Sequence, residues 1–386
     1  MKIFFVARGV PSAREPQWGS FEFDQALELK SLGHDVVILS VDSRFRRYHR
    51  KYGITCEMHE NIPHYNLYAG SIWGKALRNV SVNLHNRARR FFFMCLFKRV
   101  IKTEGMPDLI YGHYLGSASM ALAVKEKYGI PVIGIEHWSE LGYDNIDRRI
   151  KMWAEKVYTN LNLLLTVSSA LRENILKNID VDSVVVNNMV GHEFCYIPTE
   201  RNGKKVRFVT TGNLLPVKGF DNLINAFSKL NLPPDTWTLN IIGGGKERDN
   251  LRQLIDSVGL GENIHLCGRK NREGVIEMLH NSDVYLMSSR SETFGVAAIE
   301  ALACGLPVIA TDCGGARDFV TNENGVIIPV ENVEKLAESI GYMMNHYQEY
   351  DRAMIAANCQ KRFSSEAIGK QLEGIFEEVV RNSKKQ

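Results

Sequence analysis

Short apolar runs alternate with amphipathic stretches of helical length along almost the whole chain. Such runs are typical of buried strands, and their alternation with helices is typical of parallel sheets built from βαβ units. We therefore predict the α/β class. In the first half, strands are predicted at 2–6, 35–39, 108–111, 131–135, 163–167 and 183–186, with helices that include 21–31, 117–128 and 146–160.

The alternation is interrupted once, near Gly191. Residues 192–205 are polar and contain Pro198, Asn202 and Gly203, and a new strand at 206–210 restarts the pattern. Two Rossmann-like domains joined near residue 195 explain this, with their ligand expected in a cleft at the carboxyl ends of the strands. Further strands are predicted at 238–242, 263–267, 284–287, 307–310 and 326–328, followed by helices at 333–345, 350–362 and 365–381.

Composition and charge exclude several classes of protein. With 45% hydrophobic and 24% charged residues the chain is globular rather than disordered. The formal net charge of +3 gives no reason to expect a nucleic-acid partner. Seven scattered cysteines without CxxC spacing argue against a disulfide framework or a zinc site and favour the cytoplasm. No apolar stretch approaches the ~18 residues that cross a bilayer.

The segment 288–311 carries the most chemical information. A strand ends before a loop with Glu292, and a helix is predicted to begin near Phe294. The free amides of Phe294, Gly295 and Val296 would form an anion site suited to a phosphate. Glu300 follows two turns into the helix. Taken singly, Glu292 is better explained as a charge that stabilises the helix start, and Glu300 as a solvated residue.

The whole segment resembles the nucleotide-sugar signature of the retaining GT-B glycosyltransferases, of the family-four type that builds bacterial polysaccharides and glycolipids. That pattern has two Glu with seven residues between them, Phe-Gly after the first, and Gly-x-Pro-Val at the end, which Glu292 and Glu300 match. The resemblance covers nearly the whole chain. It implies an acceptor domain at 1–195, a nucleotide-sugar domain at 196–364, the two facing each other across a deep cleft, and a terminal helix at 365–386 that returns to the first domain.

The resemblance also implies the reaction. A hexose-type sugar would pass from a nucleoside diphosphate sugar, UDP rather than GDP, to a glycan or lipid-linked acceptor with retention of configuration and without a metal or other cofactor. Lys218 and the helix amides would hold the diphosphate, Glu300 the ribose, Glu292 the sugar hydroxyls and His137 the sugar near its 6-position. Other residues expected at the donor are Gly19, Gly212, Asn213, Gly243, Gly268, Arg269 and Thr293.

Three positions qualify this interpretation. Asn213 stands where the family usually has an Arg that neutralises the diphosphate, so the cationic role rests on Lys218. His113 and His137 both end strands predicted to be adjacent, and a single strand-end His is about as often structural as functional. We assign His137 to the donor sugar first and His113 to the acceptor side.

Other function classes remain as alternatives. A nucleotide-sugar epimerase and a catalytically silent GT-B subunit would both keep this fold, and Asn213 favours the second. A dehydrogenase is disfavoured because no GxGxxG opens either domain, and a serine hydrolase because GxSxG is missing. The pair Asp180 and Asp182 resembles a manganese motif only by chance.

The small net charge hides an uneven distribution. Residues 44–102 hold 13 Lys and Arg against Glu57 and Glu60, a local excess of +11, so the remainder carries −8. The densest part, 87–99, mixes bulky apolar residues with Arg87, Arg89 and Arg90 in the manner of a helix that lies on anionic lipid. The family resemblance implies that these arginines lie on the acceptor side, at the inner face of the plasma membrane. A buried helix with solvated ends explains the pattern nearly as well.

Overall fold

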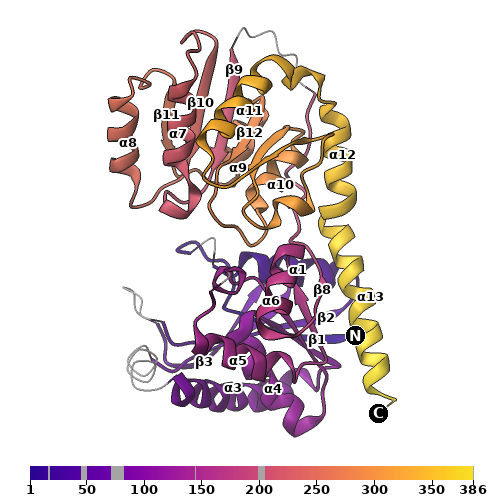
Figure 1. The fold of residues 1–386 in the computed structure, drawn as a ribbon. Coiled ribbons are helices and arrows are strands. Elements are labelled where there is room, and N and C mark those ends of the chain that lie inside the picture. The colour runs from indigo at the N-terminus through magenta and orange to yellow at the C-terminus, as the bar shows by residue number, and fades with distance from the viewer. Residues whose placement is uncertain (16–17, 45–49, 71–81, 144, 199–204, 386) are drawn as a thin grey trace. The chain divides into compact units, whose positions relative to one another are not determined.

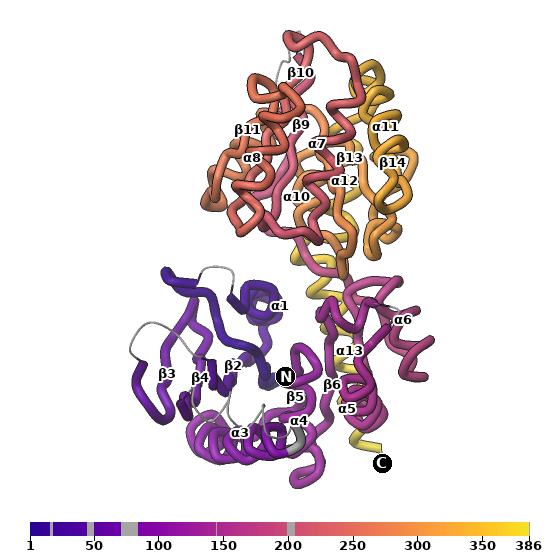
Figure 2. Tube along the Cα trace, turned by 60° about the vertical axis from the view of Figure 1, so that its left-hand side comes forward, coloured from indigo at the N-terminus to yellow at the C-terminus, as the bar shows by residue number. Residues whose placement is uncertain are grey.

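The computed structural model describes residues 1–15, 18–44, 50–70, 82–143, 145–198 and 205–385 (Figures 1 and 2). The chain forms two compact units, which are described separately. Unit 1 comprises Met1–Val167, Leu171–Met189 and Ile368–Gln386, and unit 2 comprises Ser168–Ala170 and Val190–Ala367. The division therefore lies between residues 189 and 190, a little before the position near 195 that the sequence suggested, and α13 (Ser365–Ser383) passes from one unit to the other.

Unit 1 is built on an eight-stranded sheet in the order β3-β4-β2-β1-β5-β6-β7-β8. Its strands are parallel except β3, which pairs antiparallel with β4. The bounds are β1 (Lys2–Val6), β2 (Asp35–Asp42), β3 (Gly53–His59), β4 (Ile62–Tyr68), β5 (Leu109–His113), β6 (Val132–Glu136), β7 (Leu163–Thr166) and β8 (Val184–Val185).

Alternate residues of β5 show how the helices cover both faces of this sheet. Ile110 joins the apolar cluster formed with Phe93 and Phe97 of α3 (Val82–Glu104) and with α4 (Tyr114–Tyr128). Tyr111 points to the other face, where its hydroxyl donates to Gln25 of α1 (Ser20–Ser31) at 3.0 Å and its ring lies 4.9 Å from that of Phe376 of α13. Helices α5 (Arg148–Tyr158) and α6 (Ser169–Ile179) complete the crossovers.

The last helix packs on unit 1, as the family resemblance implied. Ile368, Leu372 and Phe376 are buried, and Glu373 contacts His34 at 3.0 Å between Oε1 and Nε2. Figure 1 shows the helix, in yellow, running toward the C-terminus beside the strands of this unit. These apolar residues therefore form the packing face of the helix.

The sequence reading missed strands β3 and β4. Strand β3 lies at the sheet edge and is exposed along most of its length, so it lacks the apolar run or clean alternation that marks a buried strand. Among the described residues, no helix combines the length and apolar character that a bilayer-spanning segment requires.

Unit 2 contains a six-stranded parallel sheet in the order β11-β10-β9-β12-β13-β14. Helices α7, α8 and α11 share a buried cluster with the strands, and α10 packs against α12. The bounds are β9 (Val206–Thr211), α7 (Phe220–Lys229), β10 (Trp237–Ile242), α8 (Arg248–Ser257), β11 (Ile264–Gly268), α9 (Arg272–His280), β12 (Val284–Met287), α10 (Val296–Ala303), β13 (Val308–Thr311), β14 (Gly325–Ile328), α11 (Val333–His346) and α12 (Arg352–Phe363).

Each sheet has one point where the direction of chain progression reverses. In unit 1 the strand order turns between β1 and β5, and in unit 2 between β9 and β12. Loops that leave such strands diverge to opposite faces, so a crevice opens at their carboxyl ends. The two loop clusters at these points are therefore where ligand-binding residues are expected.

Candidate functional site

The loops that follow β9 and β12 in unit 2 are fastened to each other. Ser288 Oγ donates to the carbonyl of Lys218 at 3.0 Å, and the Arg290 amide donates to the carbonyl of Val217 at 2.7 Å. Gly219 has a φ of 64°, and a Cβ there would overlap the Ser288 carbonyl. Only glycine fits this close approach, which fixes Lys218 just before α7.

Lys218 and Glu292 form an ion pair at this point. Lys218 Nζ contacts Glu292 Oε1, and Ser289 Oγ donates to the same oxygen at 2.8 Å. The two side chains keep 24% and 16% of their exposure, so solvent or a ligand can reach both. A diphosphate arriving here would compete with the carboxylate for the ammonium group, which would release Glu292 to accept hydrogen bonds from hydroxyls.

The helix that follows Glu292 starts later than predicted. Gly295 is the N-cap with φ 110°, so α10 begins at Val296 rather than near Phe294. The Phe294 side chain is buried against Phe319 and Phe363, and its backbone lies against Gly315. Thr293 beside it is half-buried. The helix starts later because Gly295 has a positive φ, so only the residues after it adopt helical angles.

Glu292 and Glu300 lie near one buried phenol. Burial raises the pKa of Tyr285, and the carboxylates of Glu300 and Glu292 raise it further. The Tyr285 hydroxyl lies 3.0 Å from Thr211 Oγ1 at the end of β9. Both acids of the sequence motif therefore lie near the same point of the loop cluster.

The other residues that the sequence predicts at the donor lie on neighbouring loops. Gly212 follows β9, and a Cβ added to it would lie 3.5 Å from Lys218 Cε. Gly243 follows β10 with φ 154°, and a Cβ there would overlap the Gly212 carbonyl. Gly268 ends β11 with φ 70°. Arg269 and Asn213 are exposed.

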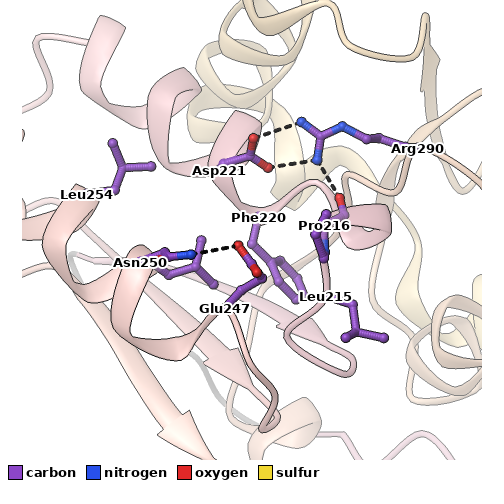
Figure 3. Close-up of a pocket in the computed structure, with 9 residues that line it drawn as sticks. Leu215, Pro216, Phe220, Asp221, Glu247, Asn250, Leu254 and Arg290 are labelled. Carbon is purple, nitrogen blue, oxygen red and sulfur yellow. Dashed lines mark hydrogen bonds and ion pairs between the residues drawn. The ribbon is translucent and has the colours of Figure 1, made fainter.

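A cavity of about 270 Å³ is lined in part by the loops that follow β9 and β12 (Figure 3). Arg290 spans its edge, donating to both oxygens of Asp221 at 2.9 and 2.8 Å and to Glu331 at 2.9 Å. Because its donors are spent on these carboxylates, Arg290 braces the two loops rather than offering a free charge. None of the predicted donor residues is among those that line the cavity, which are Leu215, Pro216, Phe220, Asp221, Glu247, Asn250, Leu251, Leu254 and Arg290.

Two histidines meet at the corresponding edge of unit 1. His113 ends β5 and His137 directly follows β6, with His113 Nδ1 and His137 Nε2 3.3 Å apart and the rings nearly parallel. Burial lowers the pKa of His137 to about 4, and burial together with His137 and Arg8 holds the pKa of His113 well below its ordinary value. Both imidazoles are therefore neutral near pH 7, and one must donate to the other.

The sequence reading missed Glu136, which organises this edge. Its fully buried carboxylate accepts hydrogen bonds from the amides of His137 at 2.9 Å, Trp138 at 2.8 Å and Leu115 at 2.8 Å, and from the Tyr158 hydroxyl at 2.6 Å. A carboxylate at the end of an apolar strand must find such partners. Its position directly after the run 132–135 was the signal that could have revealed it.

Partly buried Arg8 and buried Glu22 form an ion pair near the histidines. Arg8 Nε and Nη2 donate to the two oxygens of Glu22 at 2.6 and 3.1 Å, and the guanidinium lies 4.2 Å from the ring centre of Tyr114. Tyr114 has a φ of 67°, so the chain turns directly from β5 into α4. The predicted site residue Gly19 is the N-cap of α1, with φ 74° and its backbone against that of Gly9.

The three arginines that the sequence assigned to a lipid or acceptor face have different environments, which corrects that grouping. Arg87 is exposed. Arg90 forms an ion pair with Glu126 of α4. Arg89 points at Gly116 of α4, with its Nη1 2.7 Å from where a Cβ would stand. Arg89 and Arg90 are partly buried, because the helix turns both of them toward α4.

In the described part of the chain, no three His, Cys, Asp or Glu side chains come together in an arrangement that could hold a metal ion. Asp182 of the Asp-x-Asp pair is bound to Arg172 through two hydrogen bonds of 2.8 and 3.0 Å. All seven cysteines are free thiols.

Family comparisons match both parts of the chain. Residues 23–194 match the model described as Glycosyltransferase Family 4, and residues 197–361 match the model described as Glycosyl transferases group 1. An uncharacterised glycosyltransferase of Methanocaldococcus jannaschii is 28% identical over 287 residues, which cover 73% of this chain and 78% of the relative. Together, the two family models match most of the residues of both units.

Two further comparisons are informative. The Corynebacterium glutamicum enzyme named GDP-mannose-dependent monoacylated alpha-(1-6)-phosphatidylinositol monomannoside mannosyltransferase is 25% identical over 315 residues, covering 73% of this chain and 79% of the relative. The Anabaena HepE structure in complex with UDP superposes with a TM-score of 0.72 at 17% identity, covering 98% of this chain and 99% of that one. At this identity the structural likeness establishes the fold.

The histidine pair predicts how stability depends on pH. Because His137 has a native pKa of about 4 and an unfolded value near ~6.5, the unfolded chain takes up a proton that the native state refuses as the pH falls between these values. We expect the wild type to lose about 2 kcal/mol of unfolding free energy relative to His137→Gln between about pH 7 and about pH 5, measured by urea unfolding. Parallel pH profiles would contradict this.

Proposed function

Because the chain belongs to the GT-B glycosyltransferases of family-four type, we propose that it transfers a hexose-type sugar from a nucleoside diphosphate sugar to a glycan or lipid-linked acceptor with retention of configuration. A general role in glycan or glycolipid biosynthesis follows from the family and its relatives. The observation that carries the finer proposal is the Lys218–Glu292 pair on two fastened loops, with Glu300 near the same phenol.

The proposed mechanism relies on positioning and on charge stabilisation. Lys218 and the amides at the start of α10 bind the diphosphate as negative charge develops on it, and Glu300 binds the ribose. Glu292, released from Lys218, accepts hydrogen bonds from the sugar hydroxyls, and neutral His137 contacts the sugar near its 6-position. The departing phosphate accepts the proton of the acceptor hydroxyl as the new glycosidic bond forms on the same face, so no separate protein nucleophile is needed.

We propose a UDP-sugar as the donor rather than a GDP-sugar. The UDP complex of Anabaena HepE supports the first, whereas the printed name of the Corynebacterium relative supports the second. The decisive experiment is a screen of UDP- and GDP-sugars for released nucleotide, followed by mass spectrometry of products formed on lipid-linked acceptors. Failure of every nucleotide sugar to bind would remove the proposal.

A catalytically silent GT-B subunit is the second candidate. Asn213 is exposed where the family usually has an Arg, so Lys218 is the cation that faces Glu292 on these loops. Donor binding by calorimetry without release of UDP or GDP would favour this candidate. An epimerase would instead convert the nucleotide sugar into a second one with no acceptor present.

A membrane-facing role is proposed for one side of α3. Five exposed side chains share this side of the helix at intervals of three, four, seven and four residues, and we call them the lipid-facing set: Leu84, Arg87, Phe91, Lys98 and Lys102. Two bulky apolar groups among three cations suit a helix that lies on an anionic bilayer. We propose that unit 1 docks there, which would bring the enzyme to a lipid-linked acceptor at the inner face of the plasma membrane.

Substitution of the proposed donor contacts should lower turnover without unfolding the chain. We expect Glu292→Ala and His137→Ala each to reduce sugar transfer or donor hydrolysis by at least ~10²–10³, the usual cost of losing one such contact. Glu323→Ala, which removes an exposed carboxylate of unit 2, is the control and should retain activity. Near-normal turnover of either variant would remove that residue from the site.

Docking on lipid should depend on charge at one face of α3. Replacing Arg87, Lys98 and Lys102 by Ser should weaken flotation with 3:1 phosphatidylcholine–phosphatidylglycerol vesicles about a hundredfold, because each cation contributes about 1 kcal/mol near such a surface. The matched control replaces Arg148, Arg149 and Lys151, three exposed cations of α5, by Ser. Equal loss in both triple variants would contradict a specific face.

Turnover should not require a divalent metal, because the proposed mechanism assigns charge neutralisation to Lys218 and backbone amides. We expect undiminished activity after dialysis against EDTA, measured as nucleotide release from the preferred donor. Added Mn²⁺ or Mg²⁺ is the control. Loss of activity in EDTA with full recovery in Mn²⁺ would contradict the proposal.

A further inference from the structure

Three arginines gather where the first strands of the unit 1 sheet end. Arg8 lies two residues beyond β1, Arg44 lies two residues beyond β2, and Arg50 contacts the ends of both β2 and β4. These strands are parallel, so their carboxyl ends share one edge with the ends of β5 and β6. The arginines therefore lie along the same edge of the sheet as the histidine pair.

One carboxylate holds two of these guanidinium groups. Asp42 accepts a hydrogen bond from Arg50 Nη1 at 2.7 Å, and it accepts from both Nε and Nη2 of Arg44 at 3.3 Å. The Arg44 side chain keeps 32% of its exposure, whereas that of Arg50 keeps 12%. Charge-assisted hydrogen bonds are usually shorter than 3 Å, so Arg44 is the more weakly held cation, and a ligand can reach it.

The cluster has more N–H donors than the described residues satisfy. Arg50 Nε is buried without a hydrogen-bond partner, and Arg44 Nη1 forms no hydrogen bond within the described part of the chain. The described acids that the three guanidinium groups hold in ion pairs are Asp42 and Glu22, the second of which is bound to Arg8. An unmet buried donor and an excess of one positive charge are both costly, and one bound carboxylate would supply the missing negative charge.

The ring of Trp18 supplies an apolar surface beside this excess charge. The Arg44 guanidinium lies 3.2 Å from the ring centre, and that of Arg8 lies 4.8 Å from it. Trp18 Nε1 donates to the Arg8 carbonyl at 3.0 Å, which fixes the ring, and the residue is partly buried. A fixed aromatic face next to a planar guanidinium fork is suited to a sugar ring that carries a carboxylate.

A continuous series of contacts connects this cluster with the position proposed for the donor sugar. The Arg8 guanidinium lies 4.2 Å from the ring centre of Tyr114, and the ring centres of Tyr114 and His137 are 5.0 Å apart. His137 is the residue that we place against the transferred sugar. An acceptor bound on Trp18 and Arg44 would therefore be separated from that sugar by two side chains of the same unit.

We propose that Arg44 and Trp18, with Arg50 retaining Asp42, form a subsite for a carboxylate of the acceptor, so that the acceptor is an acidic saccharide. The carboxylate would accept hydrogen bonds from the Arg44 fork in place of its long contacts to Asp42, and the sugar ring would pack on Trp18. This inference rests on the proposed function and defines the chemical class of its acceptor.

Three probes with the same sugar ring separate a carboxylate from other groups. The full chain is titrated with methyl β-D-glucuronide, methyl β-D-glucoside and glucose 6-phosphate, and affinities are measured by ligand-observed NMR, which detects weak binding. We expect the glucuronide to bind at least about tenfold more tightly than the glucoside, because a charge-assisted pair with Arg44 is added. Equal affinities, or no binding of the glucuronide, would overturn the subsite. Preference for glucose 6-phosphate would overturn its assignment to a carboxylate.

The decisive variant is Arg44→Gln, which removes the charge and keeps a polar side chain. The preference for glucuronide over glucoside should fall about tenfold, and Arg44→Lys, which keeps the charge but not the fork, should restore part of it. A merely structural arginine would instead weaken both probes alike. Arg149→Gln is the matched control and should keep the preference, because Arg149 contacts Asp147 two residues earlier, as Arg44 contacts Asp42.

The salt dependence of the wild type keeps the proposal testable if Arg44→Gln does not fold. Glucuronide affinity should fall several-fold between about 0.05 M and about 1 M NaCl, whereas glucoside affinity should change little because it involves no ion pair. A preference that does not respond to salt, or that Arg44→Gln leaves unchanged, would overturn the subsite. Binding of UDP- and GDP-sugars is measured on the same wild-type protein, so failure of the proposed donor function is distinguished from failure of the acceptor subsite.

Discussion

The buried carboxylate of Glu136 is the interaction on which the edge of unit 1 depends. It joins the end of β6 to the start of α4 through Leu115 and to α5 through Tyr158, while also binding the amide of His137. Because the ion is fully buried, removing any one donor would leave it short of a partner at a cost of about 1–3 kcal/mol. The satisfied carboxylate therefore sets where His113 and His137 meet, and where the first turn of α4 opens beside Arg89.

Unit 2 reaches a comparable rigidity by backbone contact instead of a buried charge. Its loops approach so closely that glycines are required, as at Gly219 against Ser288 and Gly314 against Glu292. Thr311 adds a hydrogen bond to the Ser289 carbonyl at 2.6 Å. The Lys218–Glu292 pair is thus held on two sides by main chain. In both sheets, the loops at the point where the strand order reverses hold polar side chains in fixed positions. Positioning a substrate requires such fixed side chains.

The α/β class, the terminal helix and the region of the donor loops could be predicted because they depend on local pattern. Alternating apolar runs identify strands, and the Glu292–Glu300 segment is contiguous in sequence. Contacts such as Arg8 with Glu22, or Glu136 with Tyr158, join residues of different elements, so their partners could not be read from spacing. The edge strand β3 was missed because exposure on most of its positions removes the alternation. The start of α10 was misplaced because Gly295 adopts a positive φ.

The basic residues of α3 that contribute to the charge asymmetry of the chain lie on more than one side of the helix. Arg87, Lys98 and Lys102 are exposed cations, screened by salt and suited to a surface of many weak contacts. Arg89 is partly buried, and its guanidinium lies against Gly116 of α4. The same residue type two positions apart therefore has two environments: Arg87 suits a diffuse anionic surface, and Arg89 packs against α4. A count of basic residues cannot distinguish them, whereas the helical period can, because 100° per residue places them on different sides of the helix.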